Sequence, residues 1–209
     1  LGMVPKTNLP TYAEFYEERY FTEGKEDVGV YYLDEAAINF GTHLLFSCVD
    51  MPELVIGCEI CEDLWVADPP AVNHALAGAT LIVNLSASNE TVGKEAYRRM
   101  LVQSASGRLL CAYVYVSAGD GESTQDVVFG GHNMIAENGL ILAEERPFGK
   151  ACVYADVDLQ RLLMERRRMG TFGKEPKEAY LEIPIFLKKE DTKLDRAFWH
   201  MPFVPASEE

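Results

Sequence analysis

Short apolar runs alternate with longer amphipathic stretches along the chain. The short runs are rich in β-branched and aromatic residues and are bounded by polar or turn-forming residues, a pattern that predicts β-strands. The predicted strands lie at residues 28–33, 38–40, 43–49, 53–61, 80–86, 111–117, 127–129, 133–144 and 151–158, with the end of another strand at 1–4. The Asn138-Gly139 pair within one of these runs predicts a two-residue hairpin turn.

The longer stretches carry apolar side chains at helical spacing. The predicted helices occupy residues 11–20, 71–79, 91–110 and 158–169. The first begins with Thr11 and Glu14 in a capping-box pattern. The last begins at Asp158 and carries its arginines toward its C-terminal end, where the helix dipole favours positive charge. Residues 180–187 and 188–209 are expected to be irregular.

This order of strands and helices predicts an α/β fold in which helices cover mixed β-sheets. A chain of 209 residues fits one large domain better than two. We therefore expect a single domain over residues 1–209, with 188–209 serving as an irregular linker.

The composition excludes several classes of protein. The 19 basic and 33 acidic side chains give a net charge of −14, which disfavours nucleic acid or an anionic membrane as a partner. No apolar run reaches the roughly 18 residues needed to span a membrane. The five cysteines are odd in number and scattered, which does not fit a disulfide scaffold and indicates a reducing, cytoplasmic setting.

Two cysteines, Cys58 and Cys61, form a C-x-x-C pair with acidic neighbours. Strand alternation over 54–61 places their thiols on opposite faces, and the chain has no second C-x-x-C and only four dispersed histidines. These facts argue against a redox dithiol or a zinc site, and they predict that Cys58 is a core residue. For Cys61 the pattern leaves two interpretations: a core cysteine, or a cysteine at a strand end where α/β sheets bind ligands.

The segment GCEICEDLW (57–65) resembles the nucleophile elbow of the nitrilase, or carbon–nitrogen hydrolase, superfamily. It is joined by three further segments: PKTNLPTYAEFYEERYF, NLSASNETVGK and AYVYVSAGDGESTQDVVFGGHNMIAENG. Together they resemble one branch of that superfamily, the glutaminase domain of glutamine-dependent NAD synthetases. The resemblance covers nearly the whole chain and implies a nitrilase-like α-β-β-α sandwich.

In that family a Glu–Lys–Cys triad hydrolyses the side-chain amide of glutamine, and the matching positions here are Lys6 and Cys61. The resemblance implies that the Cys61 thiol attacks the amide carbon, while the Lys6 ammonium and the backbone N–H of Glu62 hold the oxyanion. By its pattern alone, Lys6 would be a solvated loop lysine. The resemblance also makes Glu14, eight positions after Lys6, the second glutamate that orients this lysine and the substrate.

Further residues match positions that bind glutamine in the family: Tyr12, Glu62, Ser88 and Lys94. Tyr12 fits a core aromatic position on the predicted helix equally well. Lys94 stands where the family has an arginine. A lysine keeps the positive charge but lacks the planar two-point fork that binds a carboxylate.

The resemblance also has implications beyond the 209 residues. It places the general-base glutamate of the triad upstream of Leu1, and downstream a synthetase domain that uses ATP and Mg²⁺ to amidate deamido-NAD with the released ammonia. We therefore expect a partial glutaminase domain of a homo-oligomeric enzyme. It would have no cofactor of its own and, without the base, little hydrolytic activity by itself.

Two other functions fit the same residues. A free-standing amidase or carbamoylase would use Lys6 and Cys61 on a different amide, and a pyrophosphate-binding loop downstream would distinguish the synthetase from it. A scaffold domain would keep the fold without the chemistry. The presence of Lys6, Glu14 and Cys61 together argues against the scaffold.

Overall fold

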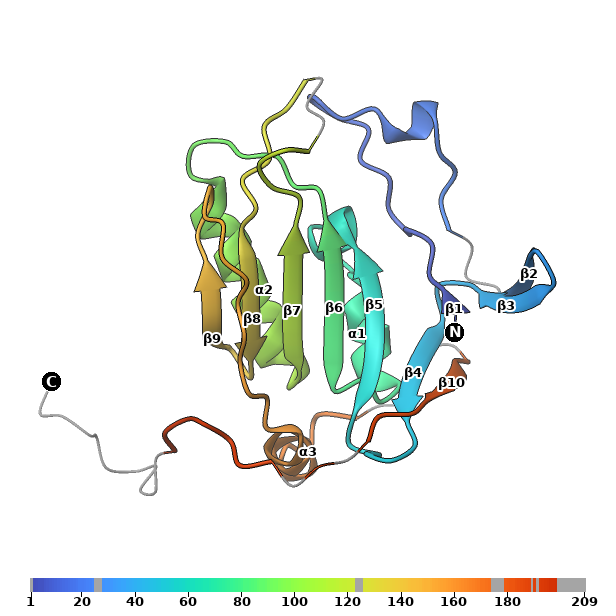
Figure 1. The fold of residues 1–209 in the computed structure, drawn as a ribbon, viewed down its shortest axis with the longest axis vertical. Helices are drawn as coiled ribbons and strands as arrows, with labels where there is room; N and C mark the ends of the chain where they lie inside the picture. Colours follow the sequence, from blue (N-terminus) through green and yellow to red (C-terminus); the bar gives the residue numbers. More distant parts are fainter. Residues whose placement is uncertain are drawn as a thin grey trace, which may run out of the picture.

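A seven-stranded mixed sheet forms the centre of the computed structural model (Figure 1). The structure describes residues 2–24, 28–122, 126–173, 179–188, 190 and 192–198. The strand order is β10-β4-β5-β6-β7-β8-β9. The strands are β4 (Leu44–Cys48), β5 (Val55–Ile60), β6 (Leu81–Ser86), β7 (Ala112–Ser117), β8 (Asn133–Glu137), β9 (Leu140–Glu145) and β10 (Leu181–Ile185). Strands β5, β6 and β7 are parallel, and their antiparallel neighbours β4 and β8 flank them. The C-terminal ends of the three parallel strands therefore meet at one edge, where ligands bind in many α/β proteins.

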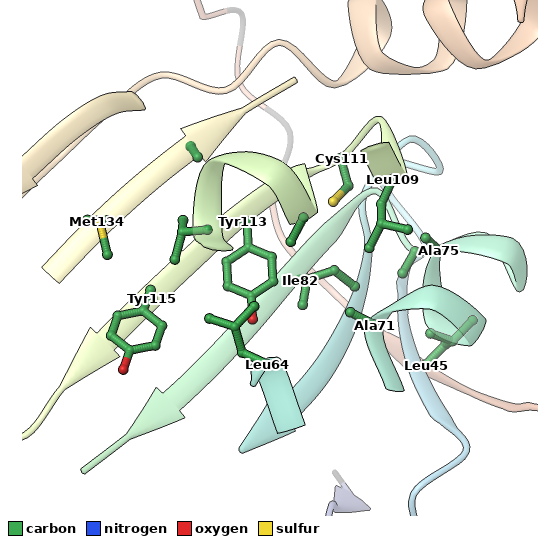
Figure 2. Close-up of a cluster of buried hydrophobic side chains, with 14 residues drawn as sticks. Leu45, Leu64, Ala71, Ala75, Ile82, Leu109, Cys111, Tyr113, Tyr115 and Met134 are labelled. Carbon is green, nitrogen blue, oxygen red and sulfur yellow. The ribbon is translucent and has the colours of Figure 1, made fainter. Parts of the chain in front are cut away.

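Two helices, α1 (Pro70–Leu76) and α2 (Lys94–Leu109), cover one face of the large sheet (Figure 1). The main core fills the space between these helices and the sheet (Figure 2). Ile82, Tyr113 and Tyr115 point into this core from β6 and β7 and are fully buried, as is Val102 of α2. Burying one such aliphatic or aromatic side chain contributes about 1.5–3 kcal/mol.

A third helix, α3 (Leu159–Arg168), lies beyond the N-terminal ends of the parallel strands (Figure 1). It begins after Asp158, whose Oδ1 accepts a hydrogen bond from the backbone N–H of Arg161 at 2.9 Å. This contact confirms the predicted N-cap. The helix lies at the edge of the sheet opposite to the C-terminal ends of β5, β6 and β7.

A second sheet of three strands has the order β1-β3-β2. Its strands are β1 (Gly2–Met3), β2 (Gly29–Leu33) and β3 (Ala36–Phe40). Strand β1 packs closely on the large sheet at β4 and β10, because a Cβ atom at Gly2 would lie 2.6 Å from Ile183 Cδ1 and 3.0 Å from Leu44 Cδ1. A larger residue at position 2 would displace these side chains and the start of the loop that carries Lys6.

The remaining predicted elements largely agree with the structure. The predicted α/β class with mixed sheets is confirmed, as is the hairpin at Asn138-Gly139, whose φ angles of 47° and 82° suit a two-residue turn. The described residues contain helices on one face of the large sheet, and the second helical layer of the expected sandwich is not among them. No helix in the described ranges is long and apolar enough to cross a membrane.

The helix predicted over 11–20 is wrong. Only a 3-10 turn, η1 (Glu17–Arg19), forms within it, and Ala13 interrupts the segment with a φ of 50°. The Thr11 hydroxyl accepts a hydrogen bond from the backbone N–H of Glu18 at 3.3 Å, so the predicted capping box with Glu14 is absent. The polar side chains of this segment instead bind partners in distant parts of the chain.

Three other segments differ from the prediction. At 127–129 only Phe129 forms an isolated bridge, and residues 151–158 contain no strand. Residues 181–185, predicted to be irregular, form β10, which pairs in parallel with β4 at the edge of the sheet. An edge strand tolerates Pro184, which lacks a backbone N–H. In the segment 188–209, the described residues contain no helix or strand, and the linker role stays a prediction.

Candidate active site

Cys61 lies at the sharp turn where β5 ends. It is the first residue of the 3-10 turn η2 (Cys61–Leu64) and has a φ of 51°, a left-handed conformation that costs a non-glycine residue about 1–3 kcal/mol. The residue lines a cavity of about 510 Å³ together with Ile60 and Leu85. The strand alternation that predicted opposite faces for Cys58 and Cys61 ends at Ile60 and does not extend to Cys61. Cys58 is partly buried, and burial raises the pKa of its thiol to about 11.

Side chains hold the two backbone N–H groups at this turn. The N–H of Cys61 donates to Asn84 Oδ1 at 3.1 Å, and that of Ile60 donates to Asp63 Oδ2 at 2.9 Å. The other oxygen of Asp63 accepts hydrogen bonds from both the backbone N–H and the side-chain amide of Asn8, each at 2.9 Å. Asp63 is buried, and it ties the Cys61 turn directly to the loop that carries Lys6.

Lys6 and Cys61 line the same cavity, as the resemblance predicted. The Lys6 side chain is 15% exposed, which excludes the solvated loop lysine. Its Nζ lies 2.5 Å from Oε2 of Glu17, which also lines the cavity. The carboxylate that contacts Lys6 is therefore that of Glu17, not of Glu14. Sequence reasoning missed Glu17 because the resemblance assigned the glutamate that orients Lys6 to Glu14.

Glu14 belongs to a different cluster, which is built around Asn89. Its Oε1 accepts a hydrogen bond from the Asn89 side-chain amide, and Asn89 Oδ1 accepts one from Lys94 Nζ. The Lys94 ammonium also lies 5.1 Å from the ring centre of Trp65 and 5.6 Å from that of Phe15, within cation–π range. Burial lowers the pKa of Lys94. Lys94 is thus a partly desolvated cation, and Trp65 is a neighbour that the sequence pattern did not single out.

Tyr12 and Glu62 form a third pair at the rim of the site. The Tyr12 hydroxyl donates to Glu62 Oε1 at 2.8 Å. Tyr12 is 55% exposed, so the core interpretation of this residue is wrong. Burial raises the pKa of Glu62, and desolvation together with the Glu62 carboxylate raises the pKa of Tyr12. Glu62 is a half-buried carboxylate that accepts a hydrogen bond from Tyr12, and such a group is suited to bind a cationic group of a ligand.

Ser88 is buried behind the cavity. Its neighbours Ser86 and Ala87 line the cavity, whereas the Ser88 hydroxyl accepts a hydrogen bond from Arg98 Nη2 at 3.3 Å. Arg98 is completely buried in α2, and its other contacts include Glu90, at 3.0 Å, and the backbone carbonyl of Asn89. Ser88 therefore follows two residues that line the cavity, and a buried arginine holds its hydroxyl.

Comparison with known proteins identifies the family. The family model for carbon–nitrogen hydrolases matches residues 2–164, which is most of the chain. The chain belongs to the carbon–nitrogen hydrolase family. The mixed-sheet fold described above agrees with this assignment.

Relatives of this carbon–nitrogen hydrolase point to one branch. A glutamine-dependent NAD(+) synthetase of Mycobacterium tuberculosis is 46% identical over 216 aligned positions, which cover 99% of this chain and 32% of that protein. The crystal structure of a glutamine-dependent NAD(+) synthetase from Cytophaga hutchinsonii matches 70% of this chain and 23% of its own, with a TM-score of 0.59 and 29% identity. A nitrilase-superfamily protein of Saccharomyces cerevisiae shares the fold, with a TM-score of 0.55 over 79% of this chain and 51% of its own at 20% identity. The chain spans about a third of the length of the curated relatives it matches.

The carbon–nitrogen hydrolase also contains a cluster of potential metal ligands away from Cys61. Ligand atoms of Glu95, His132 and Glu144 lie within 4.8 Å of one another. His132 and Glu144 are already hydrogen-bonded to each other and to neighbouring arginines. His132 Nε2 lies 2.9 Å from one oxygen of Glu144, and Arg99 Nε donates to the other at 2.9 Å. His132, Glu144 and Arg99 therefore form a hydrogen-bonded network that joins α2 to the region of the β8–β9 hairpin.

Proposed function

We propose that this chain is the glutamine-hydrolysing part of a glutamine-dependent NAD synthetase. The observation that carries the proposal is the cavity that brings the Cys61 thiol and the Lys6 ammonium together beside a strained turn. Similarity to glutamine-dependent NAD(+) synthetases over 99% of the chain supports glutamine as the amide.

The proposed reaction begins with attack of the Cys61 sulfur on the γ-carboxamide carbon of glutamine. The tetrahedral oxyanion is held by the Lys6 ammonium, which Glu17 orients, and by the backbone N–H of Glu62. Collapse breaks the C–N bond and releases ammonia, and water then hydrolyses the γ-glutamyl thioester to glutamate and the free thiol. A general-base glutamate would take the thiol proton and pass it to the departing nitrogen, which leaves as ammonia. The resemblance does not assign that base to a residue of this sequence.

Glutamine recognition is proposed to use the charges at the rim of the cavity. The Lys94 ammonium would bind the α-carboxylate, and Glu62, held by Tyr12, would bind the α-ammonium group. Glu14 would act through Asn89, whose side chain connects it to Lys94. Ser88 would shape the wall of the site. Because Lys94 is a point charge, its hold on the α-carboxylate depends on Asn89 and Trp65 to fix its position.

The fate of the ammonia follows from the same proposal. A separate synthetase domain would use it to amidate deamido-NAD, and the ATP and Mg²⁺ of that reaction would belong to the synthetase domain. The glutaminase step itself is proposed to need no cofactor, because the thiol supplies the nucleophile and Lys6 supplies the positive charge.

Affinity labelling tests this proposal. The natural full-length protein is treated with a diazoketone analogue of glutamine, and the adduct is located by peptide mass spectrometry. We expect labelling at Cys61 and release of ammonia from glutamine by the unlabelled protein. Cys61→Ala should lower this turnover by at least about 1,000-fold and Lys6→Met by about 100–1,000-fold. Cys58→Ala, which changes a cysteine three positions away, should retain activity. Labelling of another cysteine, or full turnover by Cys61→Ala, would overturn the assignment.

A further inference from the structure

Beneath the Cys61 turn lies a buried polar network between β5 and the core. Glu59 of β5 and Asn84 of β6 are neighbours across the two strands, and both point toward α1 and α2 with exposures of 1% and 0%. The hydrogen bond from the Cys61 N–H to Asn84 Oδ1, at 3.1 Å, links this network to the turn. We propose that Glu59 is a positioning residue that fixes the orientation of the Asn84 amide and, through it, the Cys61 turn.

Three hydrogen-bond donors surround the Glu59 carboxylate. The Tyr113 hydroxyl and the Asn84 side-chain amide, at 3.4 Å, both donate to Oε1, and the backbone N–H of Ala71 donates to Oε2 at 3.0 Å. An ionised carboxylate only accepts hydrogen bonds, so it suits all three partners. Burial raises the pKa of Glu59 to about 7, so the acceptor-only form predominates at pH 8.5.

The carboxylate determines which end of the Asn84 amide faces the nucleophile. With the Asn84 nitrogen held by Glu59 and by Tyr113 Oη at 3.2 Å, only its oxygen is left to face the Cys61 N–H. If the Asn84 amide were reversed, its NH2 group would face the Cys61 N–H, and neither group could accept a hydrogen bond from the other. The Cys61 N–H would then lack its acceptor, and the φ of 51° at this residue would lose the contact that fixes it.

Exchanging the carboxylate and the amide between positions 59 and 84 tests whether Glu59 sets the orientation of the Asn84 amide. In Glu59→Gln the new side-chain amide competes with the Asn84 amide as a donor, so Asn84 is expected to reverse. In Asn84→Asp two carboxylates are buried side by side. When both substitutions are combined, the glutamine amide at position 59 can donate to the aspartate at position 84, while its oxygen accepts from the Ala71 N–H. The second oxygen of that aspartate then accepts from the Cys61 N–H. The double variant therefore restores these hydrogen bonds with the charge moved from one side chain to the other.

The experiment uses the natural full-length protein at pH 8.5, and its activity readout rests on the proposed glutaminase function. We expect each single substitution to lower kcat for glutamine hydrolysis by about 10- to 100-fold with a smaller change in KM, as for a nucleophile displaced by a fraction of an ångström. The double variant should recover to within about 3-fold of the parent protein. Glu137→Gln changes another buried glutamate, at the opposite end of the sheet, and should leave kcat unchanged.

A second readout separates this inference from the proposed function. The alkylation rate of Cys61 by iodoacetamide, measured by peptide mass spectrometry, should fall in both single variants and recover in the double variant even if another amide is the substrate. Absence of glutamine turnover in the parent protein would refute the proposed function, and the alkylation pattern would then decide this inference. If a single variant does not fold, Asn84→Ala removes the whole amide, both the acceptor for the Cys61 N–H and the donor to Glu59, and should show the same loss. Parent-like kcat and alkylation in the folded single variants, or a double variant no better than either, would overturn the inference.

Discussion

Three carboxylates lie within two positions of Cys61, and each has a different environment. Glu59 faces the core and meets hydrogen-bond donors, while Asp63 binds the Asn8 loop and the Ile60 N–H. Glu62 faces outward, where Tyr12 donates to it. The acidic residues around the cysteine therefore do not act as one cluster of negative charge. Two of them hold the turn and its neighbouring loop, and the third lies where a ligand can reach it.

The burial of His74 makes the stability of the folded chain depend on pH. This histidine of α1 is buried, with Nε2 3.0 Å from the Cys58 carbonyl and Nδ1 2.8 Å from the Tyr180 hydroxyl. Burial lowers its pKa to about 4. The unfolded chain, with a histidine pKa of about 6.5, therefore binds more protons between pH 6.5 and 4. The stability that neutral His74 contributes is present above pH 6.5 and is lost as the pH falls toward 4.

We therefore predict that His74→Gln, which has no titrating group, loses less thermal stability than the parent protein between pH 7.5 and pH 5. Thermal unfolding of both proteins at the two pH values measures this difference. Glu59 has the opposite sign, because its raised pKa favours the folded state in acid and that contribution is lost as the pH rises toward 7. The Glu59 contribution is the same in the parent protein and in His74→Gln, so it cancels when the two are compared. Equal shifts in Tm for the two proteins would contradict the prediction.

At the level of the elements, one side chain joins three helices. Arg166 of α3 donates to the carbonyls of Leu110 at 2.9 Å and Ala79 at 2.5 Å, and it also reaches those of Leu109 and Gly78. These carbonyls lie at the C-terminal ends of α1 and α2 or just beyond them, where helices leave acceptors unsatisfied and favour positive charge. Arg166 thus caps α2 from α3 and also binds the turn that follows α1.

This arrangement makes Arg166 the arginine of α3 on which stability depends. We predict that Arg166→Leu lowers the free energy of unfolding by about 2–3 kcal/mol, because it leaves buried carbonyls without a donor. Arg167 lies next to it and is exposed, so Arg167→Leu should change stability by no more than about 0.5 kcal/mol. Urea unfolding of the two variants makes the comparison. Similar losses in both would show that helix composition, not capping, is responsible.

The elements that the sequence predicted correctly are those with local causes. Strands β5, β6 and β7 follow continuous apolar runs, and the Asn138-Gly139 turn follows from two residues that tolerate positive φ. Strand β10 was missed because its formation depends on pairing with β4, which is far away in the sequence. The run at 151–158 has strand-forming residues, yet it forms no strand in the structure.

In the candidate site, too, the residues with local signals were predicted and those that depend on distant contacts were not. The cysteine at a strand end was visible in the pattern, and the resemblance selected Lys6 as its partner. Glu17 could not be found, because residues 11–20 have helical periodicity but fold according to contacts with other segments. Tyr16, for example, donates to Asp126 at 2.5 Å, and Glu17 binds Lys6. In this segment tertiary hydrogen bonds outweigh a helix propensity of at most about 1 kcal/mol per residue.

Across the whole molecule, the candidate site and the contacts that anchor α3 lie at opposite ends of the large sheet. The Cys61 turn follows the C-terminal end of β5, whereas α3 and the chain after β10 lie at the other end (Figure 1). There Arg196 donates to Glu137 Oε1 at 2.7 Å, and the second oxygen of Glu137 accepts the backbone N–H of Asp158 at 2.6 Å. One buried carboxylate therefore holds both the start of α3 and the C-terminal segment.

Because of this separation, breaking the anchor should affect stability but not the site. Glu137 is 3% exposed, so Arg196→Ala leaves a buried charge without its cationic partner, and we predict a loss of about 3 kcal/mol in the free energy of unfolding. Hydrogen exchange should increase in residues 192–198 and in the first turn of α3, while the alkylation rate of Cys61 stays unchanged. Lys188→Ala, which breaks an exposed ion pair with Glu190, should change stability by no more than about 0.5 kcal/mol. A change in Cys61 reactivity in Arg196→Ala would show instead that the two ends of the sheet are coupled.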